Sequence, residues 1–70
     1  MNRTPVSSSN IRSIGYDPQT AILEVEFTSG DVYRYFDVSE YSYQQFLHAS
    51  SPGQFLNDNI RYNYRYQKVS

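Results

Sequence analysis

Residues 23–27 alternate strictly between apolar and acidic side chains, and this pattern constrains the fold more than any other part of the chain. Leu23, Val25 and Phe27 are apolar, and Glu24 and Glu26 lie between them. Because successive side chains of a β-strand point to opposite faces of a sheet, the alternation predicts a strand with one buried and one solvated face. The expected fold therefore contains an antiparallel sheet covered on one side.

Turn signals on both sides of this strand predict two neighbouring strands. Residues 17–20, Asp-Pro-Gln-Thr, are typical of a type I turn, because proline presets φ and aspartate accepts from backbone amides. They end a first strand expected over residues 10–16. Ser29-Gly30 predicts a hairpin loop, because glycine tolerates positive φ, and leads into a third strand over residues 31–36. There we expect Tyr33 and Tyr35 to face the core, since the opposite choice buries Arg34 without a partner.

The hydrophobic period changes from two to about 3.6 at Asp37, which predicts a helix over residues 39–49. Asp37 is the expected N-cap, as the first residue of a capping box, and Ser39 is the alternative. Two sets of residues could face inward: Val38, Tyr41, Gln45 and His48, or Tyr43, Phe46, Leu47 and Ala49. We favour the second set because it is more apolar.

A second helix is predicted to follow Ser51, which begins another capping box with Pro52 at the first helical position. The poor helix formers at residues 57–59 should keep this helix to two or three turns and loosen it by Asn59. Alternation returns after Arg61 and predicts a fourth strand. The expected fold class is α+β: a three-stranded antiparallel meander, two short helices and a C-terminal strand (β-β-β-α-α-β). Residues 1–8 are small and polar, and we expect a flexible N-terminus.

Composition excludes several kinds of function. The chain has 70 residues, no Cys and a net charge of -1, so it has no overall attraction for phosphate polymers. No apolar run approaches the roughly 20 residues of a membrane span, and we expect a cytoplasmic protein without a membrane partner. His48 is the only His, and Asp58 lacks the further carboxylates of a metal loop. We therefore expect no catalysis, no cofactor and no metal.

The candidate binding residues lie near the C-terminus. Eight Tyr and four Phe are too many for so small a core, and surface tyrosines are common at contact surfaces. Arg that holds phosphate beside aromatic rings that stack on bases is typical of single-strand binding. The candidate set is Asn57, Arg61, Tyr62, Tyr64, Arg65, Tyr66 and Lys68.

Two interpretations of this set remain open. In the first, it binds RNA or single-stranded nucleic acid, or else another protein or a second copy of the chain. In the second, the tyrosines belong to an ordinary amphipathic strand. Asn57 then holds a turn, and Arg61 pairs with Asp31, Asp37 or Asp58.

Spaced motifs from Val6 to about Val69 together resemble the KTSC domain family, which is named for its occurrence at the C-terminus of some lysyl-tRNA synthetases and is also found as stand-alone bacterial and phage proteins. The motifs are Val6-x-Ser8-x-x-Ile11, Ile14-Gly15-Tyr16-Asp17, Leu23-x-Val25-x-Phe27-x-x-Gly30-x-x-Tyr33-x-Tyr35, Val38, Phe46, Ala49, Ser51, Gly53, Phe55-Leu56-Asn57 and Ile60-Arg61. The family commonly has Pro where this chain has Ser39. The resemblance implies a single KTSC-like α+β domain over residues 9–70, and the synthetase association suggests RNA binding by analogy.

Overall fold

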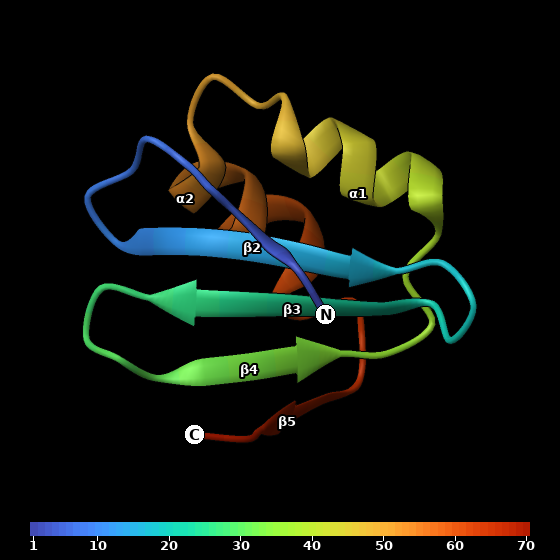
Figure 1. Ribbon diagram of the computed structural model, residues 1–70. Coiled ribbons are helices and arrows are strands. Elements are labelled where there is room, and N and C mark those ends of the chain that lie inside the picture. Colours follow the sequence, from blue (N-terminus) through green and yellow to red (C-terminus); the bar gives the residue numbers. More distant parts are fainter.

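The computed structural model describes residues 1–70 and shows helices covering one face of a five-stranded antiparallel sheet (Figure 1). The strands follow one another across the sheet in chain order. They are β1 (Arg3–Pro5), β2 (Ile11–Asp17), β3 (Ile22–Phe27), β4 (Val32–Tyr35) and β5 (Tyr66–Lys68). Between β4 and β5 lie α1 (Glu40–Leu47), α2 (Pro52–Phe55) and a π-helical turn, η1 (Leu56–Ile60), which continues α2. The predicted α+β class is confirmed.

The core lies between the sheet and the helices. Leu23 and Val25 are fully buried from the sheet, and Phe46 and Ile60 meet them from the helical side. Tyr33 and Phe27 pack against this cluster while remaining partly exposed, and Tyr35 is almost fully buried. The predicted inward face of β3 and β4 is therefore confirmed. Val38, which belonged to the less favoured helical set, is also fully buried, just before α1 begins.

The opposite face of the sheet is less open than the alternation predicted. Glu24 was expected on the solvent side, but only 6% of its surface is exposed. Strand register explains this, because Gly15, Glu24 and Arg34 stand opposite one another on three neighbouring strands. The Nε atoms of Arg34 and Arg3 lie 2.9 and 3.3 Å from the two carboxylate oxygens of Glu24. The expectation for Glu24 was wrong because sequence alternation does not reveal which cations fold over a carboxylate.

Strand β1 is an element that the sequence analysis did not predict. Arg3 pairs with Gly15 and Pro5 with Ser13, which adds a strand beside β2. Its three residues, Arg-Thr-Pro, are all exposed and carry no readable periodicity, so this strand depends on its neighbour rather than on its own sequence. The expected fraying of residues 1–8 stays a prediction.

The helix starts follow the capping side chains. Ser39 Oγ accepts from the Ser42 amide at 3.1 Å, so the alternative N-cap is the real one, while Asp37 adopts a left-handed φ of 60°. The prediction at Ser51 is confirmed, because its hydroxyl accepts from the Gln54 amide and Pro52 begins α2. Helix α1 ends at Leu47, earlier than expected.

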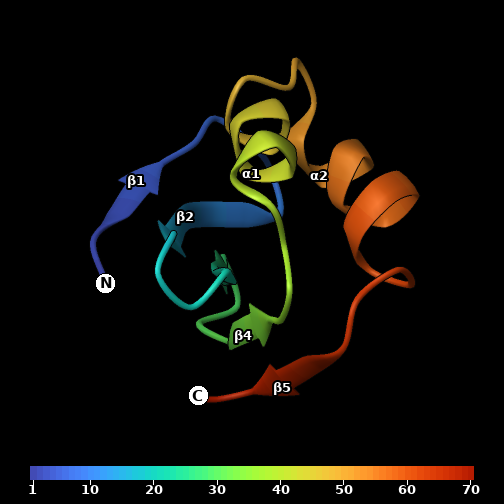
Figure 2. The same cartoon turned by 90° about the vertical axis from the view of Figure 1, so that its right-hand side faces the viewer.

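The fourth predicted strand is much shorter than expected. Strand β5 begins only at Tyr66, and both Tyr62 and Tyr64 lie in the preceding turns. In Figure 2 the chain leaves the end of η1 and crosses down to β5 at the far edge of the sheet. The prediction that these tyrosines share a strand was wrong because residues 61–65 are needed to span the two layers.

Candidate binding groove

A groove of about 560 Å³ lies between the β4–β5 edge of the sheet and the α2–η1 segment. It gathers four of the seven candidate residues, namely Asn57, Arg61, Tyr62 and Tyr66. Tyr33 and Tyr35, which the sequence predicts to face the core, also line it. We call this hollow the Arg61 groove.

Tyrosine rings in mutual contact form one side of the Arg61 groove. The ring centroid of Tyr66 lies 5.8 Å from that of Tyr33 and 5.9 Å from that of Tyr35. The centroids of Tyr33 and Tyr35 are 6.5 Å apart. Phe27 meets Tyr33 edge-on at 5.6 Å. Strand register produces this arrangement, because Tyr35 stands directly opposite Tyr66 on the neighbouring strand.

The phenol hydroxyls of this cluster are available to a ligand. The hydroxyls of Tyr33, Tyr35 and Tyr66 make no hydrogen bond within the chain. Every buried side-chain oxygen or nitrogen of the protein has a hydrogen-bond partner, so these unbonded hydroxyls are in contact with solvent. Burial raises the pKa of Tyr35 above 10.0, and the neighbouring Tyr33 adds to this, whereas the nearby Arg61 acts in the opposite direction. The Tyr35 phenol therefore keeps its proton at physiological pH, and a phenol hydroxyl can both donate and accept a hydrogen bond.

Arg61 is the only cation of the chain that has no carboxylate partner. Its Nη1 donates to Asn57 Oδ1 at 3.4 Å, and its guanidinium lies 5.3 Å from the centroid of the Tyr62 ring. The i, i+4 spacing of Asn57 and Arg61 therefore places them together, as the sequence predicted. The alternative in which Arg61 pairs with an aspartate is not found in the structure.

The other five cations are neutralised within the fold. Arg3, Arg12 and Arg34 pair with Glu24 and Glu26, Arg65 pairs with Asp37 at 3.5 Å, and Lys68 pairs with Asp31 at 3.4 Å.

Tyr64, Arg65 and Lys68 do not line the Arg61 groove. Tyr64 packs against the core, and its hydroxyl lies 3.5 Å from Ser42 Oγ. The guanidinium of Arg65 lies over the ring of Phe36, at 5.3 Å from its centroid. The structure thus divides the candidate set into four residues that line the groove and three that do not, of which Arg65 and Lys68 are ion-paired.

Sequence reasoning missed the wall of the groove that the β3–β4 hairpin supplies. Thr28, Ser29 and Asp31 line it together with Asn10 and Gly53. No sequence signal connects these residues to Arg61, because the contact depends on how α2 docks over the sheet. The tyrosine pair at positions 33 and 35 was visible in the sequence, but the partial exposure of Tyr33 was not.

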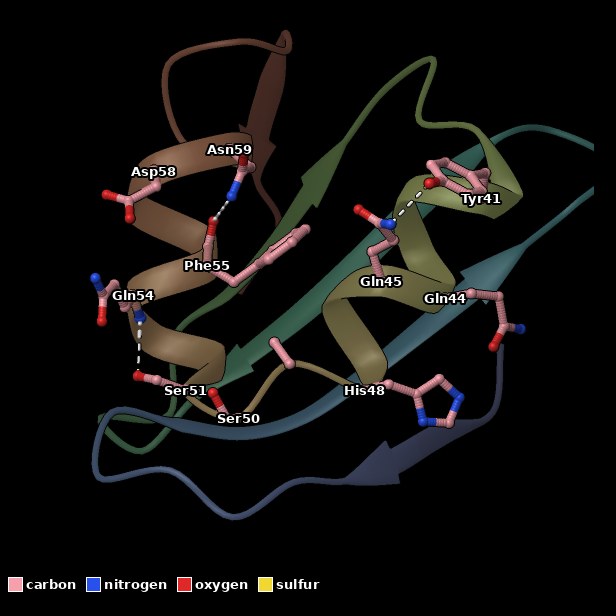
Figure 3. A pocket seen from close by; sticks show the side chains of 11 residues that line it. Tyr41, Gln44, Gln45, His48, Ser50, Ser51, Gln54, Phe55, Asp58 and Asn59 are labelled. Atoms are coloured by element: carbon pink, nitrogen blue, oxygen red, sulfur yellow. Dashed lines mark hydrogen bonds between the residues drawn. The ribbon is translucent and has the colours of Figure 1, made fainter.

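A second hollow of about 710 Å³ opens between α1 and the α2–η1 segment (Figure 3). Amide side chains dominate it, and Gln45 Nε2 donates to the Tyr41 hydroxyl at 2.8 Å. His48 and Asp58 stand on opposite sides of this hollow, so they form no acid–base pair. No group of three His, Asp or Glu side chains in the structure could hold a metal ion.

The fold and the groove define a class of small α+β domain with helices on one face of an antiparallel sheet. None of its helical segments has the length and apolar character needed to cross a membrane. The KTSC domain model matches residues 7–64, and the chain belongs to the KTSC domain family. The resemblance inferred from the motifs is confirmed.

Known proteins resemble this chain over nearly all of its length. The crystal structure of a KTSC domain protein from Yersinia pestis matches with a TM-score of 0.95 and 40% identity, over 99% of this chain and 97% of that one. A Stutzerimonas stutzeri protein is 44% identical over 70 residues, which are 99% of each chain. A lysine–tRNA ligase of Nostoc sp. is 34% identical over 62 residues, which are 89% of this chain and 11% of the ligase.

Proposed function

We propose that this domain is a non-catalytic binding module whose ligand is single-stranded RNA, held in the Arg61 groove. The observation that supports the proposal most directly is that Arg61, the one cation without a carboxylate partner, lines the same groove as the exposed rings of Tyr62 and Tyr66.

The chemistry of the groove suits a nucleotide. A guanidinium can bind two phosphate oxygens at once. Asn57 Oδ1 accepts from Arg61, which leaves the Asn57 amide nitrogen to donate to a ligand. Aromatic rings stack on bases of any sequence, and phenol hydroxyls reach base edges or ribose.

The rest of the surface is less suited to this ligand. The sheet face away from the helices carries Arg3, Arg12 and Arg34, but each is already paired with Glu24 or Glu26. Phosphate approaching these cations would also approach the carboxylates. The family relationship supports the same ligand class by analogy, since the lysine–tRNA ligase relative is by name an enzyme that acts on a tRNA.

The test is a titration of fluorescently labelled single-stranded RNA and tRNA with the domain at 50 and 200 mM salt. We expect binding that is tighter at the lower salt concentration, because phosphate contacts release counterions. Arg61→Gln should weaken binding roughly 10- to 100-fold, the value of a lost charged hydrogen bond. Arg65→Gln is the matched control and should bind normally. Absence of binding at low salt would exclude this function.

A second pair of variants isolates stacking. Tyr62, which is 80% exposed, lies at the groove, whereas Tyr41, which is 73% exposed, lies at the other hollow. Tyr62→Ser should weaken RNA binding by roughly 5- to 150-fold, the range for one stacked base. Tyr41→Ser should leave it unchanged, and an equal loss in both variants would mean that the groove is not the site.

The open edge of the sheet favours a second candidate function, self-association. Strand β5 is the last strand of the sheet, so its outer edge has no partner, and a net charge of -1 does not oppose pairing of two copies. Light scattering over a 100-fold range of concentration would show the mass doubling. A constant monomer mass would count against this candidate.

A further inference from the structure

We infer that the Arg61 groove binds one nucleotide at a time, either extruded from a single strand or free, and does not follow a run of phosphates. This inference rests on the proposed function and specifies the size of its ligand. Three observations support it: the number of cations without a carboxylate partner, the ion pairs made by the neighbouring cations, and the packing of the tyrosines.

The number of free cations limits the number of phosphates. Arg61 is the only cation that lines the groove, and it has no carboxylate partner, whereas the nearby Arg65 and Lys68 are both ion-paired. A phosphate that approached Arg65 or Lys68 would also approach Asp37 or Asp31, whose oxygens lie 3.5 and 3.4 Å from those cations. Like-charge repulsion would offset the attraction there. One strong phosphate contact is therefore expected.

The aromatic packing limits the number of bases. Tyr33, Tyr35 and Tyr66 already contact one another, with ring centroids 5.8–6.5 Å apart, so no base can enter between them. Tyr66 is 59% exposed, but it already packs against the other two rings. Tyr62 is 80% exposed and has the Arg61 guanidinium over one of its faces. The other face of Tyr62 is left as a platform for a single base.

The dimensions and the far end of the groove agree with this size. A volume of about 560 Å³ lies within the range of pockets that enclose one small ligand. Asn10, Ser29 and Asp31 at the hairpin end offer both hydrogen-bond donors and acceptors. These groups can meet the edge of a base whose phosphate is held by Arg61.

The salt dependence of binding tests the inference quantitatively. With one phosphate contact, log K should fall with log salt with a slope of about -0.7, which is a loss of roughly 2.6-fold between 50 and 200 mM. If Arg61, Arg65 and Lys68 all held phosphates, the loss would be roughly 18-fold. Arg61→Gln should abolish the slope, while Arg65→Gln and Lys68→Gln should preserve it.

A length series supplies the second measurement. We would titrate a mononucleotide, a trinucleotide and a dodecanucleotide of the same base and compare the affinity per binding position. Equal affinities support the inference and identify a free nucleotide as sufficient. Equal affinity for the two oligonucleotides, with a weaker mononucleotide, also supports it and identifies an extruded nucleotide.

The unfavourable outcomes are distinguishable. Affinity that rises steadily from three to twelve nucleotides, with an 18-fold salt effect, would overturn the single-nucleotide site and leave RNA binding intact. No binding of any of the three ligands at 50 mM salt would overturn the proposed function itself.

Discussion

Arg34 Nε lies 2.9 Å from Glu24 Oε1, on the face of the sheet that carries no helices. Arg3 reaches the second oxygen of the same carboxylate from strand β1, at 3.3 Å. The carboxylate is therefore shared by cations from both sides of β3, and this contact ties the N-terminal strand to the middle of the sheet.

Glu24→Gln should lower the free energy of unfolding by about 1.5–3 kcal/mol, because both guanidinium groups lose their charged acceptor. The loss should stay below that of a fully buried ion pair, since the side chains of Arg3 and Arg34 are 33% and 43% exposed. Urea unfolding measures this loss of stability. Asp58→Asn, at an exposed carboxylate without an ion pair, is the control and should change stability by less than about 0.5 kcal/mol. Equal effects would mean that the Glu24 contacts contribute nothing specific.

Alanine should destabilise the fold at Gly15 but not at Gly53. A Cβ at Gly15 would lie 2.6 Å from the Asn2 carbonyl oxygen and 2.9 Å from Arg3 Cγ, so β1 must move away. We expect Gly15→Ala to cost about 1–3 kcal/mol, as overpacking does, and to speed amide hydrogen exchange in residues 13–15.

A Cβ at Gly53 meets nothing closer than 3.6 Å, and the residue lies in α2. Gly53→Ala should therefore be neutral or stabilise by up to about 1 kcal/mol, through helix propensity. Destabilisation of both variants to the same extent would contradict the close approach of β1 to Gly15.

Alkaline pH should weaken the fold through two tyrosines. Burial raises the pKa of Tyr16 and of Tyr35 above 10.0 in the folded state. Above pH 10 the unfolded chain releases these protons more readily than the folded chain, so stability is fully present below pH 10 and falls as pH rises through the folded-state pKa values.

Urea unfolding at pH 8 and pH 11 measures this fall. Tyr35→Phe should make the fall smaller, because phenylalanine has no proton to release. Tyr41→Phe, at an exposed tyrosine, should leave the fall as it is. An unchanged pH dependence in Tyr35→Phe would contradict the contribution of this buried phenol.

Tyr16→Phe should cost about 0.5–1.5 kcal/mol at neutral pH, the value of one hydrogen bond. The Tyr16 hydroxyl donates to the Val38 carbonyl, which joins the end of β2 to the segment before α1. Its ring stacks on Tyr43 at 4.9 Å, and phenylalanine keeps this stack. Unfolding of the variant in urea isolates the hydroxyl, and an unchanged midpoint would show that the hydrogen bond adds nothing to stability.

The two candidate N-caps of α1 should be separable by mutation. Ser39→Ala should cost about 1 kcal/mol, because the Ser42 amide loses its acceptor. Asp37→Gly should cost little, since glycine adopts the positive φ of this position without strain. Thermal unfolding of both variants checks this, and a larger loss at Asp37 would restore it as the cap.

Local sequence patterns determined most of the elements of this fold. Period-two alternation and turn residues are properties of a few neighbouring residues, so strands β2, β3 and β4 and the turns between them could be predicted. Ser51 and Pro52 likewise determine where α2 begins. The pairing of Asn57 with Arg61 followed from helical spacing alone.

Only the tertiary structure decided which charges are neutralised and which rings are accessible. Glu24 is buried because Arg3 and Arg34 arrive from two other strands. Asp31 and Asp37 pair with Lys68 and Arg65, and Arg61 has no carboxylate partner. These relationships depend on contacts between residues far apart in the chain. No local period encodes them, and the candidate site therefore emerges only when the helices dock on the sheet.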